Sequence, residues 1–147
     1  MDVDDPEQLM ERLHQTLADF LRGDPRPVLL LFSRQDDVTL GNPFGPFVRG
    51  FEDVAATATA AATHYRDGEF VGFERVAAYE TEDLAAFVEI ERYRVKVGGN
   101  PEFSDVVLRV STLARREGDS WKIASRHADP ITGARSADSV IQRNEPG

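Results

Sequence analysis

The chain has 147 residues, a formal net charge of −9 and no cysteine. Its length suits one domain, and 41% hydrophobic residues are enough to bury a core. An acidic chain without a basic stripe excludes nucleic acid and anionic membranes as partners, and the lack of cysteine excludes disulfides and thiol chemistry. We expect a cytoplasmic protein, because the acidic start resembles no secretory leader and the apolar run VLLLF is too short to cross a bilayer.

The first predicted element is an amphipathic helix over residues 5–22. Asp5 is suited to cap its first turn, and Pro6 fits the first helical position. Apolar residues recur at helical spacing and make one stripe, formed by Leu9, Leu13, Leu17, Phe20 and Leu21. The sequence RGDPRP ends this helix. The apolar run over residues 28–34 is interpreted as a second, short helix, although its length also suits a strand.

A short strand and a longer helix follow. Residues 36–42 predict a strand that runs into the loop LGNPFGPFVRG, residues 40–50, and the alanine-rich segment 50–66 predicts a helix that packs closely against a sheet. The loop holds the glycine and proline that turns need, but a turn does not need two phenylalanines. We interpret this loop as the lip of a pocket, with Asn42 as a neutral hydrogen-bonding group and Phe44 as an apolar wall.

The second half of the chain alternates between strand-like runs and turn signals. It predicts four strands, at residues 69–81, 84–97, 105–117 and 121–130. Because these strands are long and consecutive, an antiparallel meander is the simplest topology.

Helices first and a long sheet afterwards indicate an α+β fold, with N-terminal helices packed on a curved antiparallel sheet. Such a sheet leaves a conical cavity that suits a small molecule. Residues 1–132 are expected to form this domain, and the small, polar residues of 133–147 to form a loosely ordered tail.

Three segments carry a family resemblance: the first helix ending in RGD, the run DDVTLGNPFGPFVRGFEDV, and the final hairpin LARREGDSWKIASRHADPI. They resemble the nuclear transport factor 2-like superfamily of cystatin-like cones, and within it the SnoaL-like proteins of unknown function. The superfamily includes ketosteroid isomerases, scytalone dehydratases and polyketide cyclases. The resemblance implies the cone fold and a homodimer formed through the open face of the sheet. It does not imply one activity, because this fold hosts many.

The catalytic groups of ketosteroid isomerases have no counterparts here. The family loop that carries the proton-transferring aspartate corresponds to Asn42-Pro43-Phe44-Gly45, and an amide cannot accept and return a proton at neutral pH. The position of the oxyanion-binding tyrosine falls near Thr16, and that of the neutral aspartate falls within residues 111–113. Isomerase chemistry of that type is therefore not supported.

His127 and Asp129 are the candidate catalytic residues. By the period of two they share one face of the last strand with Trp121, Ile123 and Ser125. Such a pair can act as a general base with an orienting acid. The alternative is that His127 hydrogen-bonds across the sheet and Asp129 ends the strand.

Glu89, Glu91 and Tyr93 share one face of the strand at 84–97. That face lines either a polar cavity or a subunit interface, or it carries a solvated ladder of charges. A buried glutamate needs a partner, and Arg109 is the expected one. Arg109 could instead bind a ligand carboxylate through its planar fork.

The expected pocket is therefore lined by Asn42, Phe44, Tyr93, Arg109 and His127 and takes a small apolar or carbonyl-containing molecule. We expect no metal, because His14, His64 and His127 lie on separate elements, and no cofactor, because no phosphate or dinucleotide loop is present. One hypothesis is proton-transfer chemistry of the isomerase, cyclase or dehydratase type. The other is a non-catalytic, homodimeric ligand-binding or accessory module.

Overall fold

The structure is a computed structural model that describes residues 2–143. Helix α1 (Pro6–Phe20) begins as the sequence predicts, since the carboxylate of Asp5 accepts the backbone N–H of Gln8 at 2.8 Å. Its apolar stripe is buried in the core. A short helix α2 (Arg26–Leu29) follows, so that only the first part of the predicted helix at 28–34 is helical. Phe32, further along, pairs with Ile123 in an isolated parallel bridge.

The lip of the predicted pocket is a small hairpin. Its strands are β1 (Thr39–Gly41) and β2 (Phe47–Arg49), which pair in an antiparallel manner. Helix α3 (Phe51–Ala62) comes next and buries its alanine-rich face. The second strand of this hairpin was not predicted, because it has three residues and follows directly after the turn formers Gly45 and Pro46.

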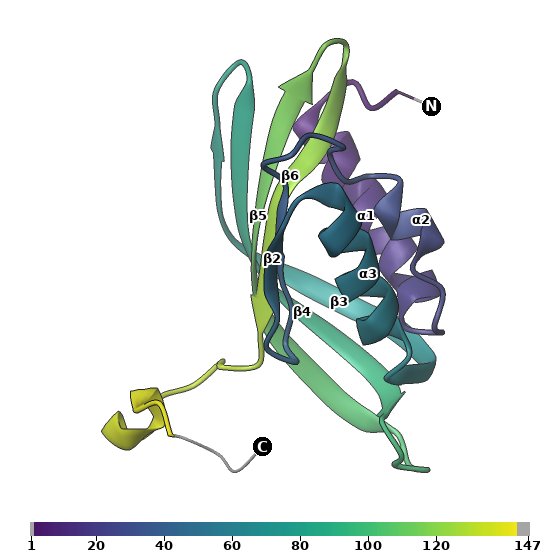
Figure 1. Cartoon of the computed structure of the whole chain (residues 1–147), viewed down its shortest axis with the longest axis vertical. Helices are drawn as coiled ribbons and strands as arrows, with labels where there is room; N and C mark the ends of the chain where they lie inside the picture. The colour runs from purple at the N-terminus through teal and green to yellow at the C-terminus, as the bar shows by residue number, and fades with distance from the viewer. Residues whose placement is uncertain (1, 144–147) are drawn as a thin grey trace.

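Four long strands form most of the sheet, as the sequence predicts, although the first begins at Tyr65, inside the segment 50–66 that was predicted to be helical. They are β3 (Tyr65–Glu80), β4 (Leu84–Val97), β5 (Ser104–Glu117) and β6 (Ser120–Asp129). The six strands lie in the order β2-β1-β6-β5-β4-β3, and β1 joins the meander through a parallel pairing with β6. Figure 1 shows that all three helices cover one face of this curved sheet and leave the other face bare. The α+β arrangement predicted from the sequence is therefore confirmed.

A bulge in β6 decides which side chains enter the interior. Ala114 pairs with Ile123, but the next residue pair is Leu113 with Ser125, so β6 holds one extra residue at this point. Such a residue reverses the alternation of faces beyond it. Trp121 and Ile123 point inward before the bulge, and Arg126 and Ala128 point inward after it. The prediction that His127 shares a face with Trp121 and Ile123 is therefore wrong.

The C-terminal segment leads away from the sheet after β6 (Figure 1). It holds one short 3-10 turn, Ala137–Val140 (η1). Residues 144–147 of the predicted tail lie outside the described residues, and the boundary at 132 stays a prediction. None of the helices formed by residues 2–143 is both long and apolar enough to cross a membrane.

Gly68 allows β3 to pass close to the end of α1. A Cβ atom at this position would lie 2.7 Å from both Leu21 Cβ and Val95 Cγ2, and 2.9 Å from the Leu21 carbonyl oxygen. We expect Gly68→Ala to lower the free energy of unfolding by about 1 to 3 kcal/mol, because backbone and core atoms must shift to admit the methyl group. Urea denaturation measures this change.

Gly72→Ala is the matched control, because it lies on the same strand and a Cβ there meets no atom within 4 Å. Its effect should stay within about 0.5 kcal/mol. Equal losses of unfolding free energy in Gly68→Ala and Gly72→Ala would show that the close contacts at Gly68 are not the cause of the loss.

Candidate functional site

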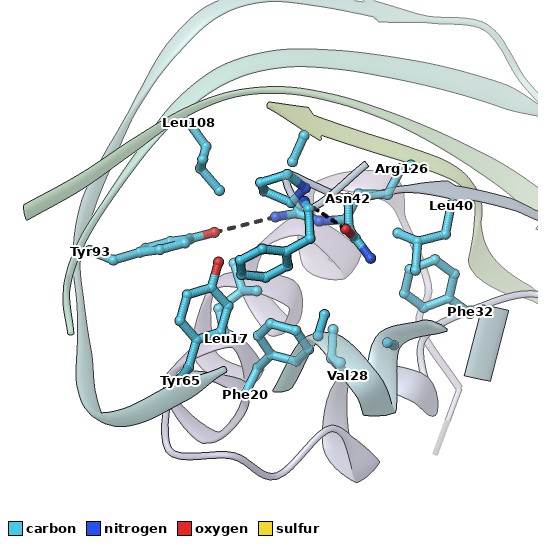
Figure 2. A pocket seen from close by; sticks show the side chains of 16 residues that line it. Leu17, Phe20, Val28, Phe32, Leu40, Asn42, Tyr65, Tyr93, Leu108 and Arg126 are labelled. Carbon is cyan, nitrogen blue, oxygen red and sulfur yellow. Dashed lines mark hydrogen bonds between the residues drawn. The ribbon is translucent and has the colours of Figure 1, made fainter. Parts of the chain in front are cut away.

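A small cavity lies between the helices and the inner face of the sheet (Figure 2). Its walls are mostly apolar and come from α1, α2, α3, the loop after β1 and the strands β3 to β6. The lining residues with polar groups are Asn42, Tyr65, Tyr93 and Arg126. The volume is about 50 Å³, which is room for a few water molecules. Pockets for drug-sized ligands measure about 300 to 1,000 Å³.

A buried ion pair closes the polar end of the cavity. Arg126 donates from Nη1 to Oε2 of Glu91 at 2.9 Å and from Nη2 to Oε1 at 2.6 Å, which is the two-point geometry that guanidinium and carboxylate favour. The hydroxyl of Tyr93 also donates to Glu91. All three side chains are buried, and Arg126 reaches across β5 to make the pair. The inner face of β4 therefore holds charge that is neutralised inside the protein.

Both members of this pair stay charged. Burial alone would raise the pKa of Glu91, but the charge and hydrogen bonds of Arg126, with the bond from Tyr93, outweigh it and hold that pKa below its usual value. Burial would likewise lower the pKa of Arg126, but Glu91 raises it above its ordinary value. The two tyrosines remain neutral acids, since burial raises the pKa of Tyr65 to about 12 and, with the charge of Glu91, raises that of Tyr93 well above its usual value.

Two hydrogen-bond donors on residues that line the cavity have no partner among residues 2–143. Within residues 2–143, Oγ1 of Thr112 is the one buried side-chain N or O atom that lacks both a hydrogen bond and exposed area. Neither the hydroxyl of Tyr65 nor Nε of Arg126 bonds to another described residue, and neither atom is sealed from solvent, so each has some exposed area; both residues line the cavity. Figure 2 shows the Tyr65 hydroxyl pointing toward the end of the cavity where Tyr93 meets Arg126. These donors are suited to an acceptor oxygen.

The loop after β1 forms one wall of the cavity. The side-chain oxygen of Asn42 accepts the backbone N–H of Phe44 at 2.8 Å, and Gly45, at φ 114°, completes the turn. The ring of Phe44 packs against His64 and Tyr65, with centroids 4.7 and 5.6 Å apart. Asn42, Phe44 and Ala61 line both the cavity and an outer hollow of about 410 Å³ beside α3, so these three residues lie between the two spaces.

The sequence-predicted site residues separate into two groups. Asn42, Phe44 and Tyr93 line the cavity. Arg109, His127 and Asp129 lie on the opposite face of the sheet, where Nε of Arg109 donates to Asp129 at 2.6 Å and Nε2 of His127 lies 3.5 Å from the same carboxylate. Arg109 therefore does not pair with the buried glutamates, and neither it nor His127 lines this cavity. The bulge in β6 is the reason that His127 does not line the cavity.

Glu89, two residues before Glu91, belongs to a second buried group. It bonds to Nε2 of His14 at 2.8 Å and to Nε of Arg75 at 3.0 Å. His14, Glu89 and Glu91 bring three potential metal ligands within 4.8 Å of one another. However, each carboxylate already holds an arginine, so the charges are balanced without a cation and a metal would have to displace Arg75 or Arg126.

Sequence reasoning missed Arg126. Counting by twos from Trp121 places it on the outer face, because the bulge leaves no clear mark in the sequence. One signal was available: if Glu91 is buried, it needs a cation as partner. That signal identifies Arg126 only when the order of the strands in the sheet is known.

Comparison with solved structures places the fold. A candidate calcium/calmodulin-dependent protein kinase type II association domain from Thiobacillus denitrificans is 17% identical, with a TM-score of 0.72 over 90% of this chain and 99% of that one. A candidate dehydratase of the nuclear transport factor 2-like family from Streptomyces avermitilis is 18% identical, with a TM-score of 0.71 over 86% and 94%. A ketosteroid isomerase-like protein from Erwinia carotovora atroseptica is 17% identical, with a TM-score of 0.70 over 86% and 94%.

These likenesses show the fold alone. No family model matches the sequence, and no curated protein matches it. The chain has the nuclear transport factor 2-like, cystatin-like cone fold that its sequence predicts, and structures similar to it include others of unknown function.

Glu91→Gln tests the ion pair. Removing the carboxylate charge leaves Arg126 buried and uncompensated, so we expect the free energy of unfolding at pH 7 to fall by about 3 to 5 kcal/mol. Because the pKa of Glu91 is lower in the folded than in the unfolded state, its contribution is present above the unfolded pKa of about 4.3 and is lost as pH falls through the folded value. The difference in unfolding free energy between the wild type and Glu91→Gln should therefore become smaller below about pH 4.

The double variant Glu91→Leu with Arg126→Met supplies the control. It removes both charges at once, so it should be more stable than Glu91→Gln alone. Urea denaturation gives the loss of unfolding free energy for the double variant and for Glu91→Leu and Arg126→Met alone. If the loss in the double variant equals the sum of the two single losses, the pair does not act as a unit.

Proposed function

We propose that the protein binds a small, mostly apolar molecule with a neutral carbonyl group in the cavity between the helices and the sheet. The observation that carries the proposal is that Tyr65 and Arg126 present free donors in a space otherwise walled by apolar side chains. A carbonyl oxygen accepts from both, while the apolar part of the ligand replaces water along the walls.

The charge of the interior favours a neutral ligand. Arg126 is already neutralised by Glu91, so a ligand carboxylate would add a buried charge without a counter-ion. A carbonyl group needs only the hydrogen bonds. This selectivity distinguishes the proposal from simple hydrophobic binding.

Ligand entry requires Phe44 to move. The cavity is too small for the proposed ligand, but the outer hollow shares Phe44 with it as a lining residue, and 43% of Phe44 is exposed. Rotation of the ring would join the two spaces. Because the Phe44 ring would occupy part of the site until a ligand binds, less water would fill that space, and the ligand would have less water to displace.

The polar groups of the cavity favour binding over proton transfer. Arg126 lowers the basicity of Glu91, the two tyrosines are neutral acids, and Asn42 cannot titrate. Among the lining residues these donors can polarise a carbonyl group, but none is suited to remove a proton from the adjacent carbon. The non-catalytic, ligand-binding alternative is therefore the better supported of the two hypotheses.

Binding of 4-phenyl-2-butanone and of butylbenzene, which has a similar shape but no oxygen, tests the proposal. We expect the ketone to bind about tenfold more tightly, because a hydrogen bond to a charged or polar donor in a dry site contributes about 1.5 kcal/mol. Tyr65→Phe should remove much of this difference, whereas Phe44→Ala should tighten binding of both. Titration followed by NMR measures the affinities, and the infrared carbonyl stretch of the bound ketone reports the hydrogen bond.

Tyr79→Phe is the control, since Tyr79 is a mostly exposed residue of β3. Equal affinities of ketone and hydrocarbon would contradict the proposal, as would a bound carbonyl stretch that Tyr65→Phe leaves unchanged. Deuterium exchange of the ketone's α-protons, faster with the protein than without it, would instead support proton-transfer chemistry.

We also propose that two copies pair through the bare face of the sheet. Ala86, Val88 and Ile90 of β4 point to this face and are half-buried, and Leu113 of β5, opposite Ala86, is 40% exposed. Four strands of about 14 residues give a face of roughly 900 Å², close to the 800 Å² or so that each partner contributes to a stable dimer. Arg109, His127 and Asp129 would then lie in or beside the interface.

Leu113→Arg tests this pairing. A charge on the apolar strip should raise the dimer dissociation constant at least about tenfold, because its burial would lack a partner. Sedimentation equilibrium gives the constant, and Leu30→Arg, at an exposed position on the helical side, is the control. A wild-type chain that sediments as a monomer would overturn the proposal.

A further inference from the structure

Three residues, which we call the neck, lie between the cavity and the outer hollow beside α3. They are Asn42, Phe44 and Ala61, and each of them lines both spaces. The cavity holds about 50 Å³ and the hollow about 410 Å³, so only the hollow has room for most of a drug-sized ligand. A ligand that places its carbonyl group in the cavity must therefore be elongated, and its middle part must lie at the neck.

The side-chain amide of Asn42 is held in one orientation by its turn. Its Oδ1 accepts the backbone N–H of Phe44 at 2.8 Å. Its backbone N–H donates to the carbonyl of Pro46 at 3.2 Å, and its own carbonyl accepts the N–H of Gly45 at 3.0 Å. An amide has one acceptor end and one donor end, so the end that accepts from Phe44 is the oxygen and the other end is Nδ2. The turn uses the oxygen and leaves the nitrogen unused.

Nδ2 of Asn42 is a third donor without a protein partner. It makes no hydrogen bond to the other residues within 2–143, and it is not sealed from solvent, so water can reach it. Figure 2 shows the Asn42 amide among the side chains that line the cavity, with its nitrogen on the side of Phe32. An aspartate or a serine would make the same bond to the N–H of Phe44. What asparagine adds at this position is the donor.

A ligand without an oxygen at the neck would cover this donor and leave it unsatisfied. The side chains of Phe44 and Ala61 hold no acceptor, so Nδ2 would lose its access to water and gain no bond in return. Burial of a polar group without a partner weakens binding. A ligand oxygen at the neck replaces the water and avoids this loss, so the neck favours ligands that carry an acceptor there.

The pairing of β1 with β6 gives the scale of the distance between the two points of recognition. Leu40 lies opposite Arg126, so Asn42 follows two residues further along, at the level of Ala128, which also lines the cavity. Two residues of a strand span about 6.6 Å. A ligand oxygen at Asn42 and a carbonyl oxygen at Arg126 therefore belong to two different groups, separated by a spacer of several bonds.

We propose that the ligand carries a second neutral acceptor oxygen, of an ether or of another carbonyl group, which accepts from Nδ2 of Asn42 at the neck. This inference rests on the proposed function, since it takes the first carbonyl group to lie at Tyr65 and Arg126. It narrows the ligand class to elongated molecules with two acceptors joined by an apolar spacer, whose far end lies in the outer hollow. Asn42 is then a residue that determines specificity.

Four para-substituted benzenes of similar shape test the two acceptors separately. The compound 4-(4-methoxyphenyl)-2-butanone has both oxygens, 4-(4-ethylphenyl)-2-butanone has only the ketone, 4-butylanisole has only the ether, and 1-butyl-4-ethylbenzene has neither. We expect each methoxy ligand to bind about threefold more tightly than its ethyl counterpart, as one net hydrogen bond between neutral groups provides. NMR titration gives the affinities, and the side-chain amide signal of Asn42 should shift more with the methoxy ligands than with the ethyl ligands.

Asn42→Asp tests the donor while keeping the turn. Its carboxylate can still accept the N–H of Phe44, but it replaces the donor by an acceptor, which repels the ether oxygen. We expect the preference for methoxy over ethyl to change by about tenfold and to reverse. Asn100→Asp is the matched control, because Oδ1 of Asn100 accepts the backbone N–H of Glu102 at 2.9 Å in a turn of the same kind, and Asn100 lines neither space. It should leave the preference as it is.

The inference is overturned if methoxy and ethyl ligands bind equally, if Asn42→Asp and Asn100→Asp change the preference by the same factor, or if both kinds of ligand shift the Asn42 amide signal equally. The same four ligands report the carbonyl site on its own, through the ratio of ketone to hydrocarbon. A protein that prefers the methoxy ligands but not the ketones would support the bond to Asn42 and contradict the proposed function. A protein that prefers the ketones but not the methoxy ligands would contradict only the second acceptor.

Discussion

The buried ion pair between Glu91 and Arg126 is the interaction on which the interior of this protein depends. Each charge would be costly to bury alone, and the two-point geometry, together with the bond from Tyr93, compensates for the lost hydration. The pair links β4 to β6 across β5, so it forms only when all three strands are in register. Because it is neutral as a unit, the cavity beside it has hydrogen-bond donors without net charge, and this sets the kind of molecule that the cavity suits.

The inner face of β4 supplies a carboxylate to each of two buried charge groups. Glu89 and Glu91 lie two residues apart on this face, yet Glu89 bonds to His14 and Arg75, whereas Glu91 bonds to Arg126 beside the cavity. Each carboxylate has its own cation, so the two negative charges coexist in a buried layer. On the outer face, Arg109, His127 and Asp129 form a third polar group. The sheet therefore carries three separate sets of charged residues, two on its inner face and one on its outer face.

The sequence was sufficient for the parts of the structure that depend on local patterns. The cap at Asp5, the stripe of α1 and the long strands all follow from spacing and turn residues. The period of two also placed Glu89, Glu91 and Tyr93 on one face of their strand, but it left open whether that face is buried or exposed to solvent. What it did not reveal depends on pairing between distant segments. Neither the parallel contact of β1 with β6 nor the extra residue near Ser125 has a local signal. That single residue exchanged His127 for Arg126 in the interior, so a site deduced by counting along β6 was placed on the wrong side of the sheet.

The parallel pairing of β1 with β6 has a consequence for how the chain matures. Thr39 bonds to Ser125, 86 residues later, and the backbone of Trp121 donates to the carbonyl of Val3. On a ribosome, β6 is the last strand of this sheet to emerge, so the lip that carries Asn42 and Phe44 cannot join the meander until β3, β4 and β5 have been made. A nascent chain that stalls before β6 would expose the unpaired edges of β1 and β5 and lack Arg126 beside Glu91. Such a fragment would be a natural target for chaperones and for quality-control proteolysis.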